Sequence, residues 1–166
     1  MDAITDFFSG TMFWRILLFV HFLMGVALLA AVTLQTTGVL IPVRKMAGKF
    51  TDRLHPIPPA SLVTPTILLY LPNFLLGAWI YTKYRTFVRI PMEQFGYWWT
   101  LGSFEFKEHA IAMGLGLLPA YWYFWRQPLS EEYATIRKWV TVFIAFAVWY
   151  SFLSGHVANN FRGVGS

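Results

Sequence analysis

The longest apolar run in the chain, Ile16 to Val43, contains no Asp, Glu, Lys or Arg and carries one histidine, His21. At about 1.5 Å per residue, this run is long enough to cross a hydrocarbon layer of roughly 30 Å. The pattern therefore predicts a transmembrane helix over residues 12–39. Because an imidazole is costly to place in a bilayer, we expect His21 to face the protein interior and to have a function.

Three further apolar runs predict helices over residues 60–82, 103–125 and 139–156. Pro65 and Pro72 are expected to kink the first of them or to leave carbonyl groups free. The pattern has no repeat and no separate soluble domain. We therefore expect one all-α transmembrane domain over residues 1–166, an integral membrane four-helix bundle.

The connections between these runs differ in character. Residues 86–102 mix aromatic side chains with proline and glycine, which indicates an interfacial aromatic segment between the second and third helices. The start Ser103-Phe104-Glu105-Phe106 is typical of a capped helix N-terminus. Residues 42–59 form a loop with a dense positive patch from Arg44 to Arg53. This patch and the acidic N-terminus favour both termini lying outside, in a bacterial inner membrane.

Composition supports the membrane class. The chain is 57% hydrophobic and only 13% charged, against the roughly 25% of a soluble domain. It has no cysteine, which excludes disulfides, iron–sulfur clusters and thiolate zinc sites. The net charge of +5 is spread over loops, so we interpret it as contact with lipid headgroups and not as a nucleic-acid surface.

Three of the four histidines are expected at one end of the bundle, because successive helices alternate in direction. These are His21, His109 and His156. The helix face of His21 carries Met24 and Gly25. A small residue beside an imidazole leaves room for a flat macrocycle or for a close helix.

The face of His109 likewise carries Met113 and Gly116. This geometry predicts haem b held by two imidazoles, His21 and His109, with His156 as an alternative ligand or a neighbouring group and the glycines providing room. Each feature also has a structural explanation: the histidines can hydrogen-bond neighbouring helices, the glycines can be close-packing sites, and the methionines can be packing residues.

Two other functions remain open. The chain could be a non-catalytic accessory subunit of a larger respiratory or photosynthetic membrane complex, since it has short loops and excess aromatic residues. It could also handle copper through His21 with Met24 and His109 with Met113, because thioethers and imidazoles suit Cu(I). No constellation typical of a hydrolase or transferase is present.

The placement of His21, His109 and His156 in four helices resembles small membrane cytochromes b. It is similar to the cytochrome b561 group, to the copper-resistance CopD-like proteins and to the HemJ group of haem-binding protoporphyrinogen oxidases. The resemblance implies haem b and electron exchange with quinone or a partner subunit. If the chain is an enzyme, it is then an oxidoreductase component.

Overall fold

The computed structural model describes residues 10–41, 57–129 and 131–161, and within these residues every regular element is helical. The long helices are α2 (Thr11–Leu40), α3 (Val63–Tyr84), α5 (Trp98–Arg126) and α6 (Ala134–Phe161). The short elements are η2 (Pro59–Leu62), the π-helical turn η3 (Arg85–Arg89), α4 (Ile90–Gln94) and η4 (Glu131–Tyr133). The all-α class is thus confirmed for this part of the chain, whereas the positive patch from Arg44 to Arg53 lies outside it.

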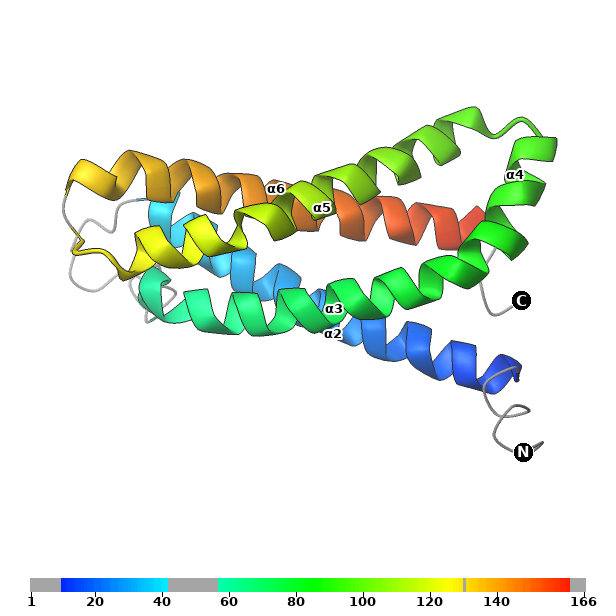
Figure 1. Cartoon of the computed structure of the whole chain (residues 1–166), viewed down its shortest axis with the longest axis horizontal. Helices are drawn as coiled ribbons and strands as arrows, with labels where there is room; N and C mark the ends of the chain where they lie inside the picture. Colours follow the sequence, from blue (N-terminus) through cyan, green and yellow to red (C-terminus); the bar gives the residue numbers. More distant parts are fainter. Residues whose placement is uncertain (1–9, 42–56, 130, 162–166) are drawn as a thin grey trace, which may run out of the picture.

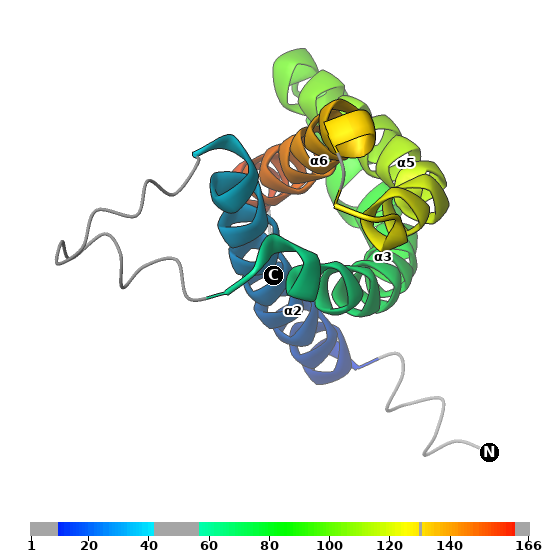
Figure 2. The ribbon, with the colours of Figure 1, turned by 90° about the vertical axis from the view of Figure 1, so that its left-hand side faces the viewer.

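The four long helices form a ring. Helix α2 packs against α3 and α6, and α5 packs against α6 and α3. Figure 1 shows that neighbours along the chain run in opposite directions, so that α2 begins and α6 ends at the same end of the ring. The view along the helices in Figure 2 shows how the four surround a central space. Side chains from all four can therefore meet on the axis of the ring.

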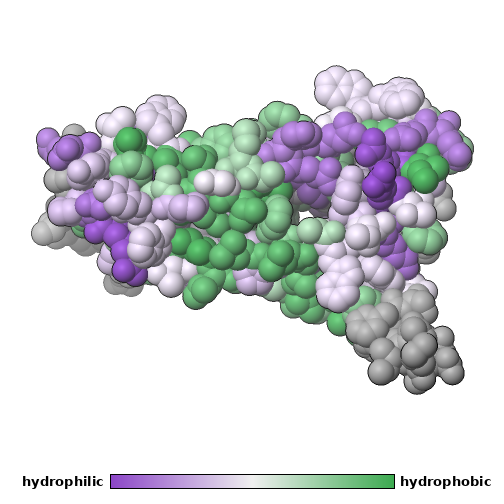
Figure 3. All heavy atoms as spheres, in the orientation of Figure 1, coloured by the Kyte–Doolittle hydropathy of each residue, from purple (hydrophilic) through white to green (hydrophobic). Residues whose placement is uncertain are grey.

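Three helical stretches of the described chain are long and apolar enough to cross a membrane: Thr11–Leu40, Pro59–Gln94 and Glu131–Asn159. Helix α5 is not among them, and its first half carries Glu105, Lys107 and Glu108. On the face drawn in Figure 3, apolar residues gather across the middle, and hydrophilic ones gather at both ends and over the first half of α5. The surface is that of a protein in contact with lipid.

Helix boundaries differ from the expected ones near α4 and α5. Helix α5 begins at Trp98, so Ser103 lies inside it and does not cap it. Most of the segment 86–102 is helical, and the chain reverses at Gly96, whose φ of 73° is in the left-handed region that glycine adopts without steric cost. Helix α3 continues through Pro72, and α5 through Pro119.

A packed core fills one half of the ring, which we call the closed half. Its buried residues are Leu28, Val32, Val63, Tyr70, Leu118, Tyr121, Ile144, Ala145 and Val148. Here Tyr121 donates a hydrogen bond to Oε1 of Gln35 (2.5 Å), and Nε2 of Gln35 donates to the carbonyl of Pro59 (3.0 Å). This chain of bonds ties α5 to α2 and to the start of α3 around a fully buried glutamine.

The rotation of α5 is set by a close contact with α3. The Tyr70 hydroxyl donates to the carbonyl of Ile111 (2.7 Å) and lies where a Cβ at Gly114 would be. Only glycine leaves this space. Since Gly114, Leu118 and Tyr121 are all buried, one row of α5 faces inward and the opposite row faces outward.

Candidate functional site

The other half of the ring, which we call the open half, contains a cavity of about 750 Å³. All four long helices contribute to its wall, including His21, Asn73, Gly77, Lys107, Ser151 and His156. Cavities that hold small molecules or cofactors span roughly 300–1,000 Å³. The cavity is therefore large enough for a ligand of that kind, and most of its wall is apolar.

His21 presents its imidazole to α3. A Cβ at Gly77 would lie 3.1 Å from Cε1 of His21, so the ring occupies space left by the missing side chain. The backbone and the side chain of Asn73 lie near enough to the same ring to interact with it. The Nδ1 atom of His21 is buried, and no hydrogen bond of good geometry reaches it from the described residues. The imidazole is thus held beside Asn73 on the wall of the cavity, without a strong partner.

Two further polar atoms around the cavity are also buried without a hydrogen bond of good geometry. Oδ1 of Asn73 and Oγ of Ser151 are buried without a hydrogen-bond partner among the described residues. A buried polar atom left unpaired costs about 1–3 kcal/mol, and such atoms in native proteins usually pair with water or a ligand. Buried polar atoms on α2, α3 and α6 around one cavity can pair with water or with a polar group of a ligand.

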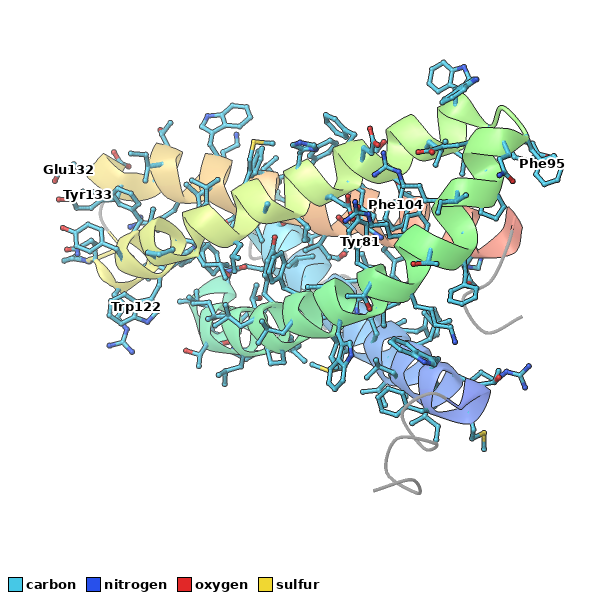
Figure 4. The ribbon with its side chains drawn as sticks, turned by 45° about the vertical axis from the view of Figure 1, so that its right-hand side comes forward. Tyr81, Phe95, Phe104, Trp122, Glu132 and Tyr133 are labelled. Carbon is cyan, nitrogen blue, oxygen red and sulfur yellow. The ribbon has the colours of Figure 1, made fainter. Side chains whose placement is uncertain are left out.

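Aromatic rings form the end of the cavity nearest α4. Tyr84 stacks on Phe104 with ring centroids 3.9 Å apart and planes 11° apart. Figure 4 shows Tyr81 and Phe104 reaching toward each other from α3 and α5, and their rings are stacked at 6.5 Å. Lys107 places its ammonium 3.8 Å from the centroid of Phe104. Flat aromatic walls favour a flat ligand.

An ion-pair network holds this end in place. Nε of Arg89 lies 2.8 Å from Oε1 of Glu93, and one terminal nitrogen of Arg89 lies 3.0 Å from Oε1 of Glu105. The second pair joins η3 to α5 across the turn at Gly96. It therefore fixes the helices that carry Tyr84 and Phe104.

The structure does not bring His21 and His109 together. His109 is exposed, it is not part of the cavity wall, and its Nδ1 lies 2.7 Å from the carbonyl oxygen of Glu105 in its own helix. The reason is the rotation of α5, which the contact between Tyr70 and Gly114 fixes. His109 lies on the opposite side of the helix from the buried row.

The other expected residues divide between the cavity and the surface. His156 and Gly25 line the same cavity as His21, although the His156 side chain is exposed. Gly116 is exposed, with no atom within 4 Å of the position its Cβ would take. Met113 is also exposed, and Met24 lies outside the cavity wall.

This arrangement separates the two His–Met pairs expected for copper. Among the described residues, no group of three or more His, Cys, Asp or Glu side chains is placed to hold a metal ion.

The sequence alone did not identify Asn73 or Lys107 as residues of the site. A signal for Asn73 exists, because Thr66, Tyr70, Asn73 and Gly77 recur at spacings of three and four along α3. Polar and small residues on a single row of an apolar helix indicate a face turned toward a polar interior.

Comparison with known proteins gives no match: no family model, no curated protein and no solved structure is similar to this chain at a significant level.

Proposed function

We propose that the chain is a membrane-embedded electron-transfer protein that binds haem b in the cavity, with His21 as an axial ligand. The carrying observation is the unpaired Nδ1 of His21 on the wall of a cavity of cofactor size. In this proposal all four long helices cross the bilayer as a four-helix bundle. Electrons are exchanged with quinone or with a partner redox subunit.

The residues around the cavity fit this cofactor. Gly25 and Gly77 keep the space beside the imidazole free of side chains. His156 lies on the same wall and would be the second residue to hold the group, in place of the expected His109. Arg15 and Lys107 supply positive charge for the acid groups of a haem.

Bound haem b would supply a one-electron redox couple whose potential depends on its ligands and its burial. The protein's own part is to hold and orient the group. His21 binds, Gly77 fixes the plane of the imidazole through close contact, and the aromatic wall of Tyr84 and Phe104 excludes water from one end.

The decisive measurement is an optical spectrum of the detergent-purified protein, oxidised and then reduced with dithionite. We expect a b-type spectrum that is lost in His21→Ala and shifted in His156→Ala. His109→Ala is the matched control, because its side chain is exposed on the outside of α5, and it should leave the spectrum unchanged.

Free imidazole added to His21→Ala should restore the spectrum if the variant is folded, since it can enter the space left by the side chain. The proposal would be contradicted if the wild type gave no haem spectrum after incubation with haem, or if the spectrum depended on His109 and not on His21.

If the spectrum does depend on His21, reduction of the bound cofactor by a quinol in nanodiscs would test the electron donor.

A second candidate function is a non-catalytic subunit of a larger membrane complex. The observation that favours it is the outer face of α5, where His109 is exposed together with Gly102, Met113 and Gly116. In this alternative a neighbouring subunit packs on the small residues of this face and covers the imidazole. Native electrophoresis in mild detergent distinguishes the two, because a subunit migrates with a large assembly and a free cytochrome does not.

A further inference from the structure

Lys107 is placed between an aromatic ring and a helix backbone at the wall of the cavity. Its ammonium nitrogen lies 3.8 Å from the centroid of Phe104, and it would be 3.4 Å from a Cβ at Gly155 of α6. Glycine at position 155 therefore allows the lysine to pass close to α6. The side chain is held in the site by its neighbours and does not extend freely into solvent.

No ion pair joins Lys107 to a carboxylate of the described residues. Its neighbour Glu108 also lines the cavity and is near enough to Lys107 to interact with it electrostatically, although the two do not form an ion pair. Arg15 adds a second positive charge to the wall. The described wall thus includes two cationic side chains, Arg15 and Lys107, and one carboxylate, Glu108.

The other cations of this region are engaged elsewhere. Arg89 is bound by two carboxylates, those of Glu93 and Glu105. Lys83 lies over the rings of Trp14 and Phe87 and is not part of the cavity wall. Since no described carboxylate forms an ion pair with Lys107, an anionic ligand group would give this ammonium a direct partner in a mostly apolar cavity.

We propose that Lys107 binds a carboxylate of a flat, largely apolar ligand whose other end lies against His21. The inference rests on the proposed function, in which that carboxylate is a propionate of haem b. His21 and Lys107 line one cavity and are near enough to interact electrostatically. One ligand can therefore contact both: ring atoms at the imidazole, and an acid group at the ammonium.

The test compares an acidic ligand with its neutral ester in two proteins. The ligands are metal-free protoporphyrin IX and its dimethyl ester, and the proteins are the full chain with Lys107 and the variant Lys107→Met. Methionine keeps most of the length of the side chain and removes its charge. For each protein we take the ratio of its affinity for the diacid to its affinity for the diester. We expect this ratio to be about ten-fold higher in the wild type than in Lys107→Met.

Comparing this affinity ratio between the two proteins removes the error that comes from partitioning of the ligands into detergent or lipid. The diester partitions more strongly into detergent or lipid than the diacid, but this difference is the same for both proteins and cancels. Lys107→Arg should keep most of the preference for the acid. Glu108→Gln should increase that preference severalfold, because it removes a negative charge from the same wall.

A general loss of structure would give a different pattern. Removing an unpaired cation should leave the thermal midpoint of the ligand-free protein unchanged or raise it, whereas a structural role for Lys107 would lower that midpoint and weaken the diacid and the diester alike. An unchanged preference for the diacid in Lys107→Met would overturn the inference.

The failure of this inference and that of the proposed function can be told apart. Metal-free protoporphyrin has no iron, so ligation by His21 does not contribute to its binding. If haem gives no His21-dependent spectrum but the porphyrin acid preference depends on Lys107, the haem proposal fails and the acid site stands. If the spectrum depends on His21 and the preference does not depend on Lys107, the inference fails alone.

Discussion

The two halves of the ring differ in how their buried polar groups are satisfied. In the closed half, Gln35, Tyr121 and the Pro59 carbonyl form a continuous chain of hydrogen bonds, and Thr66 lies near enough to Tyr121 to interact with it. In the open half, the imidazole and amide groups of His21 and Asn73 each have a buried unpaired atom beside a cavity.

This difference indicates a division of labour. The closed half is packed and bonded by its own side chains, so changes there should alter the stability of the protein whether or not a ligand is present. The open half is completed by what it binds, so changes there should alter ligand binding and affect the ligand-free protein less. The four predictions below test this division, beginning with the largest effect on stability.

Gly114→Ala should be the most destabilising change. The new methyl group would overlap the Tyr70 hydroxyl, which must move and lose its bond to the Ile111 carbonyl. Overpacking and a lost hydrogen bond together predict about 3 kcal/mol of lost stability, measured by thermal unfolding in detergent. Gly116→Ala, with open space around it, is the control and should be neutral or stabilising. Equal effects at the two glycines would contradict the packing described for α5.

Gln35→Leu should cost about 2 kcal/mol, because it leaves the Tyr121 hydroxyl and the Pro59 carbonyl without their partner in a buried site. The loss should be the same with and without ligand. Thr37→Val removes an exposed hydroxyl that bonds only to the carbonyl of Leu34 in the same helix, and it should have little effect. If a Gln35 variant lost ligand binding but kept its stability, the proposed difference between the closed half and the open half would be wrong.

Gly77→Ala should have a small effect on the stability of the ligand-free protein, below about 1 kcal/mol, because the added methyl group faces a cavity and a side chain that can turn. The methyl group would displace the His21 ring from its present plane, so the affinity for haem should fall about ten-fold, as measured by spectral titration. Gly25→Ala meets only ordinary contacts at 3.7 Å and should bind nearly as well as the wild type.

Arg89→Gln should give the smallest change in stability, since its ion pairs with Glu93 and Glu105 are partly exposed. The difference from the wild type should shrink as salt is added, because salt screens exposed charges. A salt-independent loss would show that Arg89 acts through packing and not through charge.

The helices could be predicted from the sequence, whereas the faces that they turn toward one another could not. The apolar runs around His21 and Tyr70 are long enough to identify α2 and α3 from composition alone. Helix α5 is apolar on both sides beyond Glu108, so its periodicity does not distinguish the row of His109 from the row of Gly114. The choice is made by the contact of Gly114 with Tyr70, a residue 44 positions earlier.

The candidate site was predictable to a similar extent. His21 is identified by the cost of an imidazole in an apolar helix, and it lines the cavity. Lys107 has no such signal, because a lysine near the start of a helix is ordinary in any sequence. Its place beside Phe104 and Gly155 depends on how α5 and α6 pack, which no local pattern encodes.

The π-helical turn η3 has a consequence for how the sequence can change over evolutionary time. A π-helical turn holds about one residue more than an α-helical turn, so it accommodates an extra residue without changing the direction of the helix on either side. Deleting the exposed Thr86 would convert it to an ordinary helical turn and leave the residues beyond it close to their present orientation. This segment should therefore tolerate the loss of one residue better than the α-helical turns beside it.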